Sequence, residues 1–186
     1  ANPQTGDIVR VPQGEGASFG PGTWQHVFAH GTQPLRVLEL FAPPPSAGTS
    51  GAYARTQPYL ERDQWRYARE DDGPSCFRVH DGRSASLRYE PGVLTGVELS
   101  AEHLTAGWIE LAPGGVSSRT AHGGDLILFA LSGATFVRAE HGDGQVVAEL
   151  GPEDAMYVPI GSAYDIRNVG GEPCRLIFGV APSLRP

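Results

Sequence analysis

Short stretches in which apolar and polar residues alternate run through most of this chain, and they limit what it can fold into. Residues 35–41 show the alternation, and residues 93–99 and 104–111 also read as strands, between turns that contain Gly, Pro, Asp or Ser. Successive side chains of a strand point to opposite faces of its sheet, so this period predicts strands with one buried face. Further stretches of this kind are 6–12, 126–131, 136–138, 146–150, 155–158 and 174–180. Many short strands separated by turns predict an all-β barrel or sandwich.

Two segments depart from this period. Thr56 and Pro58 precede a run with charges of both signs, and Asp-Asp-Gly-Pro at 71–74 follows it. A capping residue, a proline in the first turn and a stop signal predict one short helix near residues 58–70. The run 43–51 is rich in Pro, Gly and Ser, which indicates a linker.

The chain also contains an internal repeat. Residues 34–43 align with residues 173–182, and Pro, Arg, Ala and Pro coincide at a constant separation of 139 residues. Upstream, Val-Pro-x-Gly at 11–14 matches the same pattern at 158–161. A turn, a strand and a proline matched at both ends indicate a duplicated structural unit.

Composition excludes several classes of function. The 186 residues are enough for one domain or two small ones, and their net charge of −7 argues against a nucleic-acid surface. All 14 basic residues are Arg, so this chain has no lysine for a Schiff base or a P-loop. No apolar run is long enough to cross a membrane, and no signal peptide is visible. With only Cys76 and Cys174, we expect two free thiols in a reducing compartment, and hence a cytoplasmic protein.

The second copy of the repeat resembles a cupin domain. In that family a Pro-x-Gly turn is followed by a metal-ligand histidine and then by an asparagine, and Pro159, Gly161 and Asn168 keep this spacing. Tyr164 stands where the family has its histidine. The family's first motif covers residues 114–133, and the resemblance as a whole extends from about residue 77 to 182. It implies a cupin double-stranded β-helix, also called a jelly-roll barrel.

The metal-ligand positions that the resemblance implies are mostly altered. The first motif has Thr120, His122 and Leu126 where the family has two histidines and a glutamate, and Asp125 lies one residue before the glutamate position. A hydroxyl, one imidazole and a phenol are a poor set of ligands for a divalent metal. We therefore assign no cofactor. The alternative is a divalent Fe, Mn, Ni or Zn ion held by His122 and Asp125.

Residues 6–43 resemble the second-motif half of an earlier cupin, with His26 at the ligand-histidine position. This implies a bicupin, divided into a partial N-terminal cupin at 1–45, a linker with the helix at 46–75 and a C-terminal barrel at 76–186. His26 is a further metal candidate. The front half of a first barrel is absent from the printed sequence. We expect a longer protein, a second chain that supplies the missing strands, or a decayed first copy whose strands at 8–11 and 35–41 pair elsewhere.

The candidate catalytic residues are His122, Tyr164 and Glu110. A histidine changes charge near neutral pH and is suited to general acid–base work, while a tyrosine can donate a hydrogen bond to a developing oxyanion. A hydrogen-bonded polar pair that merely fills the barrel is the alternative. Trp108 and Glu110 share one strand face, which we expect in the interior, where Glu110 would need Arg119 or His122 as a partner.

Five further residues are candidates for ligand binding. Arg119 and Thr120 lie in the first-motif turn, and Tyr157 precedes the second-motif turn. Trp108 shares the face of Glu110, and Trp24 lies in the long loop of the first copy, which is placed to cover a pocket.

These observations favour a cupin that acts on a small metabolite by isomerase, epimerase or cyclase-type acid–base chemistry. The alternatives are a metal-dependent dioxygenase or decarboxylase, and a non-catalytic cupin used for small-ligand binding or dimerisation. The expected partners are a small-molecule ligand and a second copy in a homodimer, or a second chain or segment that completes the N-terminal barrel. No nucleic acid or membrane is expected.

Overall fold

A computed structural model describes residues 1–2, 5–23, 25–43, 66–67, 77–80, 86–182 and 184. The chain divides into two compact units, of which the first comprises Ala1–Glu39 and Pro45–Arg83 and the second Leu40–Pro44 and Ser84–Pro186.

The described residues of the first unit form four short strands. β1 (Asp7–Ile8) pairs in parallel with β3 (Arg66–Tyr67), and β2 (Gly16–Phe19) pairs antiparallel with β4 (Phe77–His80). The His80 ring lies 2.8 Å from the Ser18 hydroxyl across the β2–β4 pair. The described strands of this unit thus form two separate two-stranded pairs.

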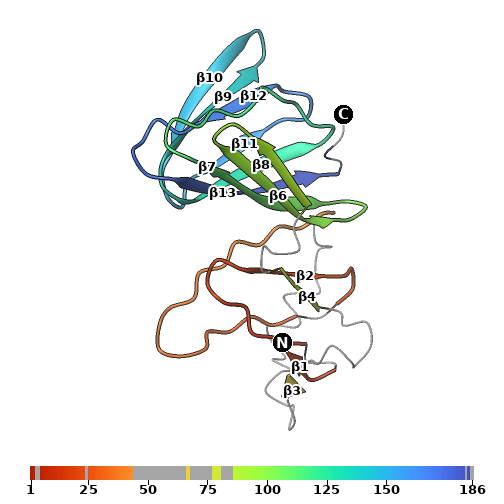
Figure 1. Ribbon diagram of the computed structural model, residues 1–186. Helices are drawn as coiled ribbons and strands as arrows, with labels where there is room; N and C mark the ends of the chain where they lie inside the picture. Colours follow the sequence, from red (N-terminus) through yellow and green to blue (C-terminus); the bar gives the residue numbers. More distant parts are fainter. Residues whose placement is uncertain are drawn as a thin grey trace. The chain divides into compact units, whose positions relative to one another are not determined.

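The second unit consists of nine described strands in two sheets (Figure 1). The larger sheet has the order β11-β8-β13-β7-β6-β5 and the smaller sheet the order β10-β9-β12. All pairs in both sheets are antiparallel. The strands are β5 (Ser86–Glu90), β6 (Val93–Ser100), β7 (Thr105–Leu111), β8 (Asp125–Ser132), β9 (Thr135–His141), β10 (Gly144–Leu150), β11 (Ala155–Val158), β12 (Tyr164–Arg167) and β13 (Cys174–Ala181).

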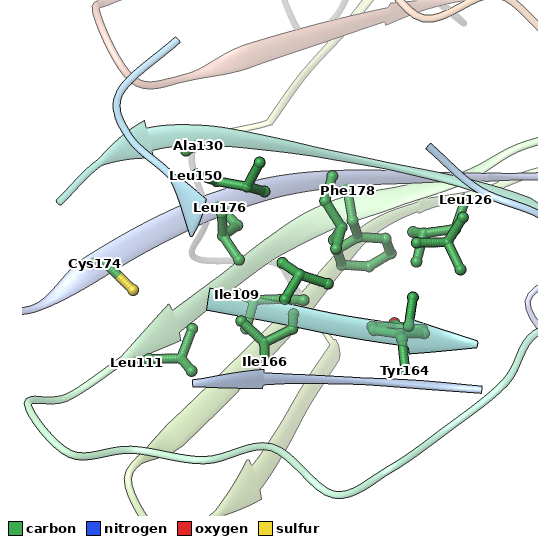
Figure 2. Close-up of a cluster of buried hydrophobic side chains, with 14 of the residues drawn as sticks. Ile109, Leu111, Leu126, Ala130, Leu150, Tyr164, Ile166, Cys174, Leu176 and Phe178 are labelled. Atoms are coloured by element: carbon green, nitrogen blue, oxygen red, sulfur yellow. The ribbon is translucent and has the colours of Figure 1, made fainter. Parts of the chain in front are cut away.

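The hydrophobic core lies between these two sheets. Every second residue of β7, β8 and β13 points inward, so that Leu111, Leu128 and Leu176 are almost fully buried. Val137 and Ile166 meet them from the smaller sheet, and Figure 2 shows part of this cluster. The alternation in the sequence thus corresponds to one apolar face on each sheet.

The all-β prediction is confirmed, and most predicted strands of the second copy are present with boundaries shifted by a few residues. The described residues contain no helix. Of the predicted helix near 58–70 only residues 66 and 67 are described, and they form β3, so the prediction otherwise lies outside the described residues.

The strands predicted for the first copy are largely wrong. Only Asp7–Ile8 of the first run is a strand, and 35–41 forms none, although β2 lies in what was predicted as a loop. Residues 35–41 pair with none of the described strands, and alternation alone does not make a strand without a partner for its backbone hydrogen bonds. Leu35, Val37 and Phe41 are consequently exposed.

Among the described residues, no helix is long and apolar enough to span a membrane.

Candidate functional site

His122 and Tyr164 form a hydrogen-bonded pair at one end of the core. His122 lies between the first-motif turn and β8, and Tyr164 begins β12, where its backbone pairs with Thr120. The Tyr164 hydroxyl lies 2.8 Å from Nε2 of His122. Tyr164 is only 4% exposed, and its ring packs within the core cluster (Figure 2). The sequence prediction that these two residues lie together is confirmed.

The other nitrogen of His122 fixes which atom carries the proton. Nδ1 lies 3.0 Å from the backbone carbonyl oxygen of Leu184, whose side chain packs against the core. A carbonyl only accepts hydrogen bonds, so Nδ1 must donate, and in the neutral ring Nε2 is then an acceptor. The Tyr164 hydroxyl therefore donates to Nε2.

Burial keeps both members of the pair uncharged. Desolvation lowers the pKa of His122, the nearby charge of Arg88 lowers it further, and the bond to Leu184 opposes the shift in part. Burial also raises the pKa of the Tyr164 phenol far above its ordinary value. At neutral pH the pair is thus a neutral imidazole base that accepts a hydrogen bond from a neutral phenol.

We expect His122 to make the folded protein less stable in mild acid. Because its pKa is lowered on folding, the unfolded chain binds a proton below about pH 6.5 and the folded chain does not. The free energy of unfolding then falls as the pH drops below that value. Urea unfolding at pH 7.5 and 5.5 measures the loss, which should be smaller in His122→Gln than in the wild type. Equal losses in both proteins would contradict this account.

The residues at the metal-ligand positions of the resembled family do not fit a metal. Leu126 is 2% exposed and belongs to the core cluster, and both ring nitrogens of His122 already have partners. The Asp125 carboxylate accepts hydrogen bonds from the Tyr157 hydroxyl at 2.8 Å and the Ile160 amide at 3.0 Å. Within the described part of the chain, no group of three or more His, Cys, Asp or Glu side chains is arranged to bind a metal.

A second polar cluster lies on the outer face of the smaller sheet, and sequence reasoning missed it. The Asp165 side chain is 3% exposed and is paired with Arg138, directly opposite on β9, and with Arg167 and Arg119. Burial opposes ionisation of Asp165, but hydrogen bonds from Arg138 and Arg167 outweigh it and lower its pKa. Arg119 also donates to Glu140. Asp165 therefore organises three half-buried arginines from distant parts of the sequence.

Trp108 is buried as predicted, with 7% of it exposed, whereas Glu110 is partly exposed and the prediction for it is wrong. Ile109 and Leu111 belong to the core between the two sheets, so Trp108 and Glu110 lie on the opposite face of the larger sheet. The carboxylate of Glu110 lies 3.7 Å from the Arg175 guanidinium, which replaces the expected partners Arg119 and His122. The structure does not bring Glu110 together with the His122–Tyr164 pair.

The remaining candidates lie apart from the pair, with one exception. Thr120 is its backbone neighbour, whereas Arg119 belongs to the Asp165 cluster and Tyr157 is exposed on the outer face. His26 is in the first unit, where its backbone bonds to Ala1 and its ring lies 5.7 Å from that of Phe28. Trp24 lies outside the described residues.

Comparison with known proteins identifies part of the chain. Residues 107–180 match the family model described as Cupin domain. No curated protein sequence matches the chain.

Several solved structures resemble it. The cupin domain of Schizosaccharomyces pombe Cnp3 is 21% identical, covers 57% of this chain and 76% of its own, and has a TM-score of 0.48. The protein TT1209 from Thermus thermophilus is 29% identical over 53% of this chain and 90% of its own, with a TM-score of 0.45.

A variant of oxalate decarboxylase from Bacillus subtilis is 18% identical over 54% of this chain and has a TM-score of 0.50. This chain spans only 28% of that longer protein, and the likeness shows the fold alone. The match to the Cupin domain model, over residues 107–180, includes both members of the His122–Tyr164 pair.

Proposed function

We propose that the cupin domain binds a small metabolite beside the His122–Tyr164 pair and transfers a proton between two of its atoms. The observation that supports this most is the direction of the hydrogen bonds. Nδ1 of His122 donates to Leu184, so Nε2 is free to accept a proton through Tyr164. Isomerisation, epimerisation and cyclisation all need such a transfer.

The proposed transfer returns the pair to its starting state. A substrate group gives its proton to the Tyr164 oxygen while the phenol proton moves to Nε2 of His122. The imidazolium that forms is stabilised by the Leu184 carbonyl, as this bond favours the charged form. The reverse movement then delivers a proton to a different substrate atom, and no oxidant or second substrate is required.

A metal-dependent dioxygenase or decarboxylase has less support. That chemistry needs several imidazole or carboxylate ligands, and Thr120, Leu126 and Tyr164 supply none at three of the four positions. We therefore derive no step through a metal.

A non-catalytic barrel is the second candidate, and one observation favours it. Tyr164 is almost fully buried, and the Leu184 carbonyl occupies the far side of the His122 ring. In that case the pair would only satisfy its own polar groups inside the core.

Deuterium exchange separates the two candidates. Aldoses, ketoses and hydroxy acids are incubated with the protein in D2O, and proton NMR follows the loss of each carbon-bound proton. Catalysis through the pair predicts exchange for at least one compound, slowed at least tenfold by His122→Gln and by Tyr164→Phe. His103→Gln, which changes an exposed histidine, is the matched control and should exchange like the wild type. No exchange by the wild type, or exchange that survives both substitutions, would favour the non-catalytic barrel.

A further inference from the structure

A continuous row of paired residues crosses the outer face of the larger sheet. Ser132 lies opposite Arg175, Arg175 opposite Glu110, Glu110 opposite Leu94, and Leu94 opposite Tyr89. These five residues, which we call the outer row, come from five adjacent strands, β8, β13, β7, β6 and β5. Four strand spacings give the row a length of about 19 Å.

The outer row lines a cleft. The cleft has a volume of about 520 Å³, and all five residues of the row contribute to its wall. This is within the range of small-molecule sites, roughly 300–1,000 Å³. The cleft is separate from the His122–Tyr164 pair, because neither residue lines it and the row faces away from the core.

The Arg175 guanidinium lies over the indole ring of Trp108. The guanidinium carbon lies 5.2 Å from the centre of the indole ring, close enough for a cation–π contact. The indole itself is fixed, because its nitrogen donates to Glu98 at 3.0 Å and its ring covers Gly96 on the neighbouring strand. A Cβ at Gly96 would come within 2.4 Å of the ring, so only glycine leaves room for it. A bulge between Arg175 and Leu176 also changes the direction of the strand here.

Arg175 and Glu110 leave hydrogen-bonding capacity for a ligand. Their charged atoms are 3.7 Å apart, which is longer than a hydrogen bond, although the residues are directly opposed. Both side chains line the cleft and are in part accessible to solvent, 30% for Arg175 and 46% for Glu110. A donor and an acceptor, both charged and side by side, therefore face the cleft.

We propose that the outer row binds a neutral saccharide. A hydroxyl group both donates and accepts hydrogen bonds, so neighbouring hydroxyls of one sugar can donate to Glu110 and accept from Arg175. Tyr89, 76% exposed at the other end of the row, offers an aromatic face for the apolar side of a sugar ring, and Leu94 lies between. The charges of Arg175 and Glu110 cancel, which favours a neutral ligand over an anion.

The proposal is tested with sugars and their matched acids. Glucose, galactose, glucuronate and galacturonate are titrated into the full chain, and affinity is measured from amide chemical shifts. We expect at least one neutral sugar to bind more tightly than its acid. Arg175→Gln and Glu110→Gln should each weaken that binding at least tenfold. Arg88→Gln, which removes an exposed arginine on the inward-facing side of β5, should change it less than twofold.

Three outcomes would overturn the proposal. They are no binding of either neutral sugar, binding that survives both substitutions, and tighter binding of the acids that increases in Glu110→Gln. The last would make the cleft an anion site at Arg175. The ion pair is partly exposed and its charged atoms are 3.7 Å apart, so its loss should cost little stability; both variants should fold, and thermal unfolding verifies this. Because the cleft and the His122–Tyr164 pair are separate, either proposal can fail without the other.

Discussion

Replacing Asp165 with alanine is expected to lower the free energy of unfolding by about 3 kcal/mol. The side chain is 3% exposed and is surrounded by Arg119, Arg138 and Arg167. Without the carboxylate, three positive charges remain close together. The estimate is at the low end for a broken buried ion pair, because the arginines are half-buried and can regain water. Urea unfolding at neutral pH measures the change.

The matched control is Asp143→Ala, in the exposed β9–β10 turn, for which we expect a change of less than about 0.5 kcal/mol. The effect of Asp165 also has a defined pH dependence. The pKa of Asp165 is lowered on folding. Its contribution to the free energy of unfolding is therefore complete above the ordinary aspartate pKa and is lost as the pH falls through the folded-state pKa. An Asp165→Ala protein as stable as the control would mean that the arginines do not depend on this carboxylate.

Replacing Leu126 with glutamate is expected to destabilise the protein by about 4 kcal/mol. Leu126 occupies the position of the family's glutamate ligand, yet it is 2% exposed within the core. A carboxyl group there loses its water and displaces apolar contacts. The measurement is again urea unfolding.

Leu126→Met is the control for this position, because it nearly conserves volume and should cost less than about 1.5 kcal/mol. If Leu126→Glu were as stable as Leu126→Met, the position would be open to water or to a cation. The family's ligand position would then still be a site rather than part of the core.

The sequence predicted most strands of the second copy, and several of them, such as β7, β8 and β13, bury one face. β8 and β13 are nearly continuous apolar runs in the sequence, and in the structure their buried residues mostly alternate with less buried ones. β5 was missed although polar and apolar residues alternate along it, and its apolar residues Leu87 and Tyr89 are exposed. Residues 35–41 alternate equally well but form no strand. Alternation therefore predicts a strand only where the fold supplies both a core and a partner.

The candidate site around His122 and Tyr164 was predictable in part. The family spacing placed His122 near Tyr164, and the structure joins them. Alternation also showed that Trp108 and Glu110 share a face, but it does not say which face is inside. The Glu110–Arg175 pair and the Asp165 cluster depend on strand register between distant segments, which a single sequence does not reveal.

Nitrogen NMR of the imidazole tests most directly whether His122 is a neutral base whose Nε2 accepts a hydrogen bond from Tyr164. The ring of protein labelled with 15N-histidine is titrated from pH 8 to pH 4, with His122→Gln used to assign its signals. We predict that the neutral ring carries its proton on Nδ1, with a pKa below about 6.5. Tyr164→Phe should shift the Nε2 resonance. A proton on Nε2 in the neutral ring, or a pKa above that value, would contradict the account.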